Sequence, residues 1–309
     1  MFRTAVSTGR KQFSVFCALA IVLALGPLVL RLTAADVGQK LKVAAVQFRS
    51  TFEIQRNCDG IRAHLKRLAA EGVQVAVFPE CALTGYDTRA TFAPSTAEVE
   101  AAEKQIQSTC REEKIGAIVG SVYKVNGHLY DTAVVFDSHG EMVERYGKLH
   151  LAGEKWATPG NHLAFFELEG IPSSVMICHD ERYPELVRLP AIKGARIMYY
   201  ISAESGLRHE KKLAPYRAQV MARAVENGVF IVQANAPANP DLSGSHGQSR
   251  IVAVDGNVLN EASFFGEDIL VNTLPIKKGN LQRPLEDFLG QWWKEGVDSL
   301  MSNRHRQLD

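Results

Sequence analysis

The chain has 309 residues and a formal net charge of +1, with 46% hydrophobic and 22% charged residues. This composition is typical of a folded soluble protein, and the small net charge gives no reason to expect a nucleic acid as partner. The chain is long enough to bury a large core, and no internal repeat, low-complexity segment or Pro/Gly-rich linker interrupts residues 40–275. We therefore predict one main domain over residues 37–280.

The N-terminal segment has a different character from the rest. Arg3, Arg10 and Lys11 precede an apolar run over residues 13–30, and small residues follow at 33–35. This order is typical of a secretory signal peptide, although the run is also almost long enough for an uncleaved membrane anchor. We expect residues 1–36 to be one of these two. The protein would then be periplasmic or extracellular, or anchored facing outside, with membrane contact only through this segment.

Predicted elements of the first half alternate between strand and helix. Residues 56–70 have apolar side chains at helical spacing, and Gly72 follows as a typical helix end. Residues 73–78 form a continuous apolar run of the kind found in buried strands. The predicted elements are strand 41–48, helix 56–70, strand 73–78, helix 97–113, and strands 115–122, 129–136 and 142–146.

The second half continues with strands at 163–168 and 175–177, helix 185–192, strand 196–201, helix 213–226, and strands 229–233, 248–254 and 257–260. Strands that alternate with helices, followed by runs of strands, predict a layered α/β sandwich with a mixed sheet. Beyond this domain, apolar residues at Phe288, Leu289, Trp292 and Leu300 predict an amphipathic helical tail over residues 281–309. Such a tail would dock on the body or on a second subunit.

Three short segments carry residues suited to chemistry. Glu80 follows a buried strand, at the kind of strand end where ligands of α/β sheets gather. Lys148 follows another strand and lies among apolar residues. Cys178 stands between a buried strand and a helix, an elbow that exposes a side chain and backbone N–H groups. Taken singly, each has an ordinary structural alternative: a solvated carboxylate, a surface lysine and a buried structural cysteine.

Together the three segments resemble the nitrilase, or carbon–nitrogen hydrolase, superfamily, on its amidase-like branch. The resemblance spans most of residues 41–275, and its motifs are Val-Ala-Ala-Val-Gln at 43–47, Phe-Pro-Glu at 78–80, Leu-Thr-Gly-Tyr at 83–86, Lys-Leu-His-Leu at 148–151, Thr-Pro-Gly at 158–160, Ile-Cys-His-Asp at 177–180 and Arg-Tyr-Pro-Glu-Leu at 182–186. It implies a four-layer α-β-β-α sandwich with two mixed sheets between helix layers. It also implies a Glu80–Lys148–Cys178 triad, a second glutamate at Glu154, and a homodimer or larger homo-oligomer.

These residue types suit the hydrolysis of a small amide or N-carbamoyl compound to a carboxylate and ammonia or an amine. Because the thiolate is the nucleophile, Cys178 needs a base, and Glu80 can take its proton. Lys148 and the backbone N–H of His179 are expected to stabilise the oxyanion. Loss of one such donor costs about 3–4 kcal/mol in other enzymes, so Lys148→Ala should be severely defective. The reaction needs no cofactor or metal.

Residues near the triad are assigned supporting roles. Glu154 is expected to orient Lys148 or to hold the leaving nitrogen. Arg182, four residues after Cys178, either stabilises the elbow by hydrogen bonds, as Asp180 is expected to, or binds a substrate carboxylate. Tyr86 and Trp156 are candidates for the pocket wall.

The cysteine pattern leaves one question open. Cys58, Cys81 and Cys110 accompany Cys178 in the main domain, and a Cys58–Cys110 disulfide is one alternative in an oxidising compartment. Sequence does not give the distance that such a bridge requires.

Three other activities remain as alternatives. A nitrilase acting on a C≡N carbon would use the same triad, but the Cys-His-Asp sequence differs from the Cys-Trp-Glu signature of such enzymes. A non-catalytic module that binds small molecules would not need an intact triad. A metal-dependent hydrolase would have to use contiguous residues of poor ligand geometry, without HxxxH or CxxC spacing; its candidate ligands are His150, Cys178, His179, Asp180 and His209.

Overall fold

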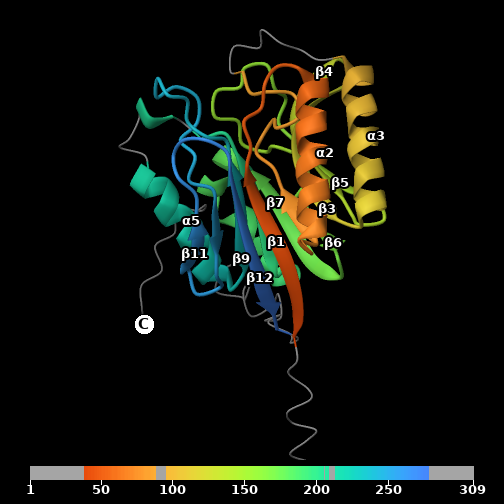
Figure 1. The fold of residues 1–309 in the computed structure, drawn as a ribbon. Helices are drawn as coiled ribbons and strands as arrows, with labels where there is room; N and C mark the ends of the chain where they lie inside the picture. Colours follow the sequence, from red (N-terminus) through yellow and green to blue (C-terminus); the bar gives the residue numbers. More distant parts are fainter. Residues whose placement is uncertain (1–37, 88–94, 205, 209–212, 278–309) are drawn as a thin grey trace, which may run out of the picture. The chain divides into compact units, whose positions relative to one another are not determined.

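The computed structural model describes residues 38–87, 95–204, 206–208 and 213–277 (Figure 1). The expected signal or anchor segment 1–36 and the expected helical tail 281–309 lie outside these residues. The described residues from Lys40 to Leu274 belong to one compact unit. No helix within the described residues is long and apolar enough to cross a membrane.

The first sheet has six strands in the order β12-β1-β2-β3-β4-β5. Strands β1, β2 and β3 run parallel, whereas β3, β4 and β5 are antiparallel neighbours, so the sheet is mixed. The strands are β1 (Gln39–Gln47), β2 (Val75–Val77), β3 (Gly116–Val125), β4 (His128–Phe136), β5 (Met142–Gly147) and β12 (Asp268–Ile276).

The second sheet is also six-stranded and mixed, in the order β11-β10-β9-β8-β7-β6. Its centre is the parallel trio β7, β8 and β9, and the outer pairs are antiparallel. The strands are β6 (Phe166–Leu168), β7 (Ile171–Ile177), β8 (Ile197–Ser202), β9 (Phe230–Asn235), β10 (Arg250–Val252) and β11 (Val258–Glu261).

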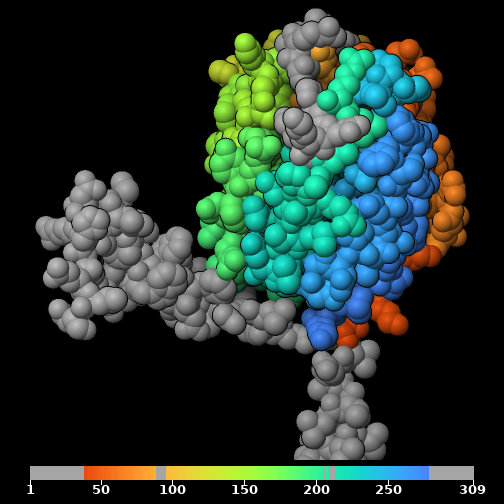
Figure 2. Space-filling view, turned by 90° about the vertical axis from the view of Figure 1, so that its left-hand side faces the viewer, coloured from red at the N-terminus to blue at the C-terminus, as the bar shows by residue number. Residues whose placement is uncertain are grey.

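Two pairs of helices cover the sheets. Helices α2 (Ile54–Ala70) and α3 (Thr96–Glu113) share an apolar core with β1 to β4, and they lie side by side in Figure 1. Helices α4 (Glu185–Lys193) and α5 (Leu213–Asn227) pack on β7 to β10, and α5 faces the viewer in Figure 2. The inner faces of the sheets meet where β2, β3 and β4 contact β9, β8 and β7. The predicted four-layer α-β-β-α sandwich is therefore confirmed.

The sequence patterns explain most of these elements. Helix α3 begins at a capping box in which Ser95 and Glu98 exchange hydrogen bonds, and α2 buries the predicted stripe Ile61, Leu65 and Leu68. Strand β12 was not predicted, because Asn272 and Pro275 interrupt its apolar pattern. It stands at the edge of its sheet in the strand order, where proline is tolerated.

All four described cysteines are free thiols, so the Cys58–Cys110 disulfide does not form. Cys58 on α2 and Cys110 on α3 are both fully buried, and the Cys58 thiol donates a hydrogen bond to the carbonyl oxygen of Ala102 at 3.5 Å. Burial raises the pKa of Cys58 to about 11 and that of Cys110 to about 12, which keeps both thiols protonated and poorly reactive at neutral pH.

Candidate active site

Glu80 is held by the loop that follows β2. This loop presses on β3 at Gly120, where an added Cβ would lie 2.2 Å from the carbonyl oxygen of Pro79 and 2.4 Å from the amide nitrogen of Cys81. Only glycine permits this close approach. The Glu80 side chain is fully buried, and its Oε2 atom accepts a hydrogen bond from the backbone N–H of Ala203 at 2.6 Å. The carboxylate therefore sits at the junction of the two sheets.

Lys148 follows β5 and is fixed at both ends. Its backbone N–H donates to the carbonyl oxygen of Asp131 at 2.8 Å. Its Nζ atom lies 2.6 Å from Glu80 Oε1 and 2.7 Å from Glu154 Oε1, and all three side chains are fully buried. Burial alone would lower the pKa of Lys148, but the surrounding carboxylates, Glu80 foremost, raise it above its ordinary value. Lys148 is thus a fixed cation.

Glu154 accepts four hydrogen bonds in its loop. Its Oε1 atom takes one from Lys148 and one from the Tyr86 hydroxyl at 2.7 Å, and its Oε2 atom takes two from the backbone N–H groups of Ala152 and Gly153, at 2.6 and 3.1 Å. Burial by itself would raise the pKa of Glu154, but Lys148 and these donors lower it to about 2. Glu154 is therefore ionised and anchors both Lys148 and Tyr86.

A third carboxyl group, which sequence reasoning missed, belongs to Asp131 on β4. It is fully buried, and its Oδ2 atom lies 3.5 Å from Lys148 Nζ, while its Oδ1 atom accepts the Cys81 thiol at 3.7 Å. Burial, followed by the nearby Glu80 carboxylate, raises the pKa of Asp131 well above its ordinary value. One oxygen each from Asp131, Glu80 and Glu154 lies within 4.8 Å of the others, an arrangement able to hold a cation, and the Lys148 ammonium contacts all three groups.

Cys178 stands at a strained elbow between β7 and a short 3-10 helix, Cys178–Arg182. Its φ angle is +47°, which is left-handed backbone and unusual for a residue other than glycine. Asp180 stabilises this elbow: its Oδ2 atom accepts the N–H of Ile177 at 3.2 Å and the Tyr146 hydroxyl at 2.8 Å, and its Oδ1 atom accepts the N–H of His150 at 2.9 Å.

A cluster of buried polar side chains contacts the backbone of the elbow through Tyr200. The Tyr200 hydroxyl donates toward the carbonyl oxygen of Cys178 at 3.1 Å, lies 2.9 Å from Glu181 Oε2 and is also hydrogen-bonded to Glu204. The Nε2 atom of His246 lies 3.1 Å from Glu204 Oε2. Burial, with the Glu204 charge second, raises the pKa of Glu181 to about 9, so Glu181 is neutral at pH 7.

The Cys178 thiol lies within electrostatic reach of the buried charges described above. Burial and then the Glu80 carboxylate raise its pKa well above the ordinary value, while Lys148 acts in the opposite direction. The resting group is therefore a thiol, and its proton has to be removed during attack by a base such as Glu80.

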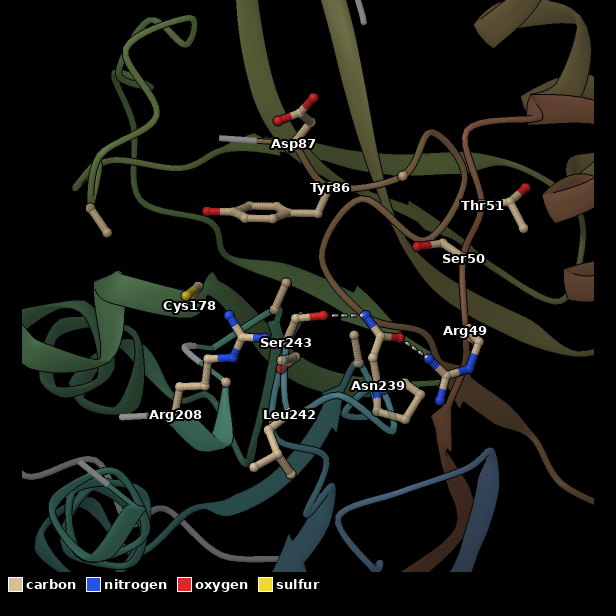
Figure 3. Close-up of a pocket in the computed structure, with 18 of the residues that line it drawn as sticks. Arg49, Ser50, Thr51, Tyr86, Asp87, Cys178, Arg208, Asn239, Leu242 and Ser243 are labelled. Carbon is tan, nitrogen blue, oxygen red and sulfur yellow. Dashed lines mark hydrogen bonds between the residues drawn. The ribbon is translucent and has the colours of Figure 1, made fainter. Parts of the chain in front are cut away.

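A cavity of about 730 Å³ opens over Cys178. Figure 3 shows the Cys178 sulfur facing this cavity, with Tyr86 on the opposite wall and Arg208, Leu242 and Ser243 nearby. Arg49 also lines it, and its guanidinium is held by the Asn239 side chain and by the carbonyl oxygen of Ala238. The remaining lining residues are Ser50, Thr51, Phe52, Gly85, Asp87, Ala152, His179, Glu181, Ala203, Gly206, Tyr216, Ala236, Pro237, Asn239, Gly244 and Ser245.

The other residues singled out from the sequence are not all at this cavity. His179 lines it, and its backbone N–H stands at the N-terminal end of the 3-10 helix, where N–H groups lack intrahelical partners. Arg182 is exposed, does not line the cavity, and lies 5.8 Å over the Tyr216 ring. Trp156 is half-buried and also does not line it.

The two-sheet sandwich, the buried Glu80–Lys148 pair and the elbow cysteine at the cavity are the features by which the sequence resembles the carbon–nitrogen hydrolases, and of these three residues Cys178 alone is among the cavity's lining residues. The chain belongs to the carbon–nitrogen hydrolase family, whose model matches residues 42–281. Sequence relatives include a 2-oxoglutaramate amidase of Bacillus subtilis (strain 168), 32% identical over 60% of this chain and 73% of that protein. An omega-amidase of Mus musculus is 28% identical over 69% of this chain and 81% of its own length.

Solved structures of amidases resemble this fold as well. A crystal structure of an amidase from Nesterenkonia sp. superposes with a TM-score of 0.70 and 26% identity, covering 84% of this chain and 97% of that one. A mutant of the Nesterenkonia sp. AN1 amidase, with acrylamide added at its active-site cysteine, has the same TM-score and identity and covers 82% of this chain and 99% of its own. The protein is thus a carbon–nitrogen hydrolase enzyme with amidase relatives.

Proposed function

We propose that this protein hydrolyses small linear amides or N-carbamoyl compounds through a thioester at Cys178. The observation that carries the proposal is the Lys148 ammonium, fixed between Glu80 and Glu154 at 2.6 and 2.7 Å beside a strained cysteine elbow that faces the cavity. A charge fixed before the reaction begins can stabilise an oxyanion without reorganisation.

In the proposed reaction, Glu80 takes the thiol proton as the sulfur of Cys178 attacks the amide carbon. Lys148 and the N–H of His179 stabilise the oxygen of the tetrahedral intermediate. Glu80 then gives its proton to the departing nitrogen as the C–N bond breaks, which leaves an acyl thioester. Water, deprotonated by Glu80, attacks the thioester, and the carboxylate product leaves as the thiol regains its proton.

The cavity favours an amide that also carries an anionic group. Arg208 lines the cavity with an exposed guanidinium, paired with Asp241 only at the solvent surface, and the contacts of Arg49 are to neutral oxygens. Arginine recognises carboxylates through paired N–H groups. The name of one relative, 2-oxoglutaramate amidase, specifies an amide that carries a carboxylate.

Turnover assays with matched substrates test both parts of the proposal. Ammonia release should be measured for a monoamide of a short dicarboxylic acid, an uncharged amide of the same length and the corresponding nitrile. We expect the first to be preferred and the nitrile to be inert. Cys178→Ala should abolish turnover, whereas Cys110→Ala, a control at a second free thiol, should leave it intact. Full turnover by Cys178→Ala would exclude the thioester.

Arg208→Ala separates the substrate preference from the chemistry. This variant should raise KM for the carboxylate-bearing amide about tenfold or more, since a charged hydrogen bond contributes about 1.5–3 kcal/mol. The uncharged amide should be unaffected. Arg67→Ala is the matched control, because the Arg67 side chain is 66% exposed against 62% for Arg208, is likewise paired with one exposed carboxylate, and lies outside the cavity lining. Equal effects of the two variants would remove Arg208 from substrate binding.

We also propose that the protein is exported (periplasmic or extracellular), or is anchored in a membrane by residues 1–36 and faces outside. The basic start and apolar run of this segment support the proposal. Fractionation of cells, with N-terminal sequencing of the mature protein, checks it; an intact N-terminus in the cytoplasmic fraction would contradict it.

A homodimer or larger homo-oligomer is proposed on the family resemblance. Large apolar side chains on the outer helices, Leu189 on α4 and Val225 on α5, are 39% and 54% exposed, which is consistent with a partner surface. Light scattering coupled to gel filtration would give the mass in solution, and a monomer at working concentration would reject this state.

A further inference from the structure

The charges around Lys148 do not balance if every neighbouring carboxyl group is ionised. Asp131, Glu80 and Glu154 surround one ammonium, and their side chains are fully buried. Three carboxylates and one ammonium would leave two uncompensated negative charges in a site without water contact. Such a site is far too costly to fold, so at least one of the three has to be protonated.

The geometry distinguishes the three groups. Glu80 and Glu154 receive short charged hydrogen bonds from Lys148 at 2.6 and 2.7 Å, together with backbone N–H donors. Both carboxyl groups thus act as acceptors, and for Glu154 these contacts lower the pKa to about 2. Asp131 Oδ2, at 3.5 Å from Nζ, accepts no hydrogen bond from a described donor, and the neighbour of its Oδ1 atom is a weakly donating thiol, Cys81. A side-chain hydrogen bond to Glu80 favours the protonated form of Asp131. The proton therefore belongs on Asp131.

A lysine ammonium has three N–H donors. Two are occupied by Glu80 and Glu154, and the third has no strong acceptor while Asp131 is neutral. We propose that Asp131 is a positioning residue that acts in its neutral, protonated form and leaves the third N–H of Lys148 free for the substrate's carbonyl oxygen. This inference rests on the proposed function, in which Lys148 stabilises the oxyanion.

Ionisation of Asp131 would oppose catalysis in two ways. A carboxylate at this position would attract the third N–H away from the substrate. It would also add a negative charge next to a site where negative charge has to develop on the substrate oxygen. The groups that face Asp131 are Glu80, Lys148 and Glu154, with Cys81 and Tyr146 on the flanking segments. Burial, followed by the Glu80 and Glu154 carboxylates, raises the pKa of Asp131 and keeps its proton in place, and the opposing effect of Lys148 is smaller.

The decisive variant is Asp131→Asn, which keeps the shape and neutrality of the protonated side chain but cannot ionise. It should retain kcat within about threefold of the unsubstituted enzyme at pH 7. Asp131→Ala, which leaves a hole beside Lys148, should lose about 100-fold in kcat with little change in KM, because misplaced catalytic groups cost that much. Glu80→Gln is the matched control: its carboxylate is needed as such, so it should be inactive.

The dependence of activity on pH distinguishes the proposed role of Asp131 from a merely structural one, because a structural role would leave this dependence unchanged. Activity of the unsubstituted enzyme should fall at alkaline pH as Asp131 ionises, and Asp131→Asn should move this fall to higher pH. An Asn variant that folds normally but loses activity about as much as the Ala variant would overturn the proposal, because a charge would then be required. The proposal would also be overturned if the activity of Asp131→Asn fell at the same alkaline pH as that of the unsubstituted enzyme, or if the Asn and Ala variants were both fully active.

If Asp131→Asn folds poorly, the neighbour Cys81 offers a second test. Cys81→Ser places a stronger hydrogen-bond donor on Asp131 Oδ1 and should shift the alkaline fall to lower pH; Cys81→Ala removes the donor and should shift it upward. If neither Cys81 variant changed the pH at which activity falls, the proposed role of Asp131 would be contradicted. The thioester mechanism is tested separately, because turnover by Cys178→Ala would refute that mechanism whatever the Asp131 variants do.

Discussion

Replacement of Glu154 by glutamine is the substitution whose consequences the structure defines most fully. Two donors, Lys148 and Tyr86, approach Oε1, and two backbone N–H groups approach Oε2. A glutamine side chain has one oxygen and one NH₂ group. In either orientation its NH₂ group faces two donors, so Glu154→Gln would leave two donors without an acceptor: Lys148 and Tyr86 in one orientation, and the backbone N–H groups of Ala152 and Gly153 in the other. In both cases Lys148 loses a charged partner.

The size of the effect follows from the pKa of Glu154. Donors and the Lys148 ammonium overcome the effect of burial and lower this pKa from 4.5 to about 2, which corresponds to about 3 kcal/mol of folding free energy. Because the folded-state pKa is lowered, this contribution is complete above pH 4.5 and is lost as the pH falls toward 2. Glu154→Gln should therefore destabilise the protein by about 3 kcal/mol at pH 7, and by progressively less below pH 4.5.

Urea unfolding at pH 7 and at a series of acidic pH values measures this difference, and ammonia release measures the catalytic effect. We expect kcat to fall by about 100-fold, because Lys148 loses its fixed orientation. Glu112→Gln, at an exposed position on α3, is the control and should match the unsubstituted protein in both assays. Unchanged stability and turnover in Glu154→Gln would refute the account of this anchor.

Three further substitutions test other parts of the site. Gly120→Ala should displace the Glu80 loop, because its Cβ would meet backbone atoms at 2.2 and 2.4 Å; we expect at least a 100-fold loss of kcat with a lower melting temperature. Tyr200→Phe removes the donor to the Cys178 carbonyl and should cost about 1–3 kcal/mol in urea unfolding. The folded-state pKa of Glu181 is raised to about 9. The unsubstituted protein should therefore lose stability as the pH rises from about 5 to 9. Glu181→Gln cannot ionise at this position and should lose less stability over the same interval.

The sequence patterns predicted the parts of the site that lie at strand ends. Glu80, Lys148 and Cys178 each follow a β-strand, and the structure places Glu80 and Lys148 in direct contact at 2.6 Å although 68 residues separate them. Strand ends were recognisable because apolar runs stop at polar residues. Arg182 was predicted to stabilise the elbow or to bind a substrate carboxylate. It lies on the 3-10 helix of the elbow, and its guanidinium is 5.8 Å from the ring of Tyr216, a cavity residue, while Arg182 itself is not among the lining residues. Its role stays a prediction.

The rest of the site depends on tertiary contacts that local patterns do not report. Asp131 lies inside a strand, and the one available signal was a charged residue next to a run of buried positions on β4. Tyr200 lies within a uniformly buried strand, so the contact of its hydroxyl with the elbow could not be predicted before β8 was placed beside β7. Arg208 belongs to a loop, and only the fold brings it to the cavity of Cys178.

The central claim is that an acyl thioester forms at Cys178. Rapid quenching of the enzyme with an amide that it turns over, followed by intact-mass measurement and peptide mapping, tests it most directly. The account predicts a mass increase equal to the acyl half of the substrate, located on Cys178 and absent from Cys178→Ala. Two results would contradict this claim. One is turnover with no covalent intermediate trapped by hydroxylamine or by acid quenching. The other is an adduct on Cys58, Cys81 or Cys110 instead of Cys178.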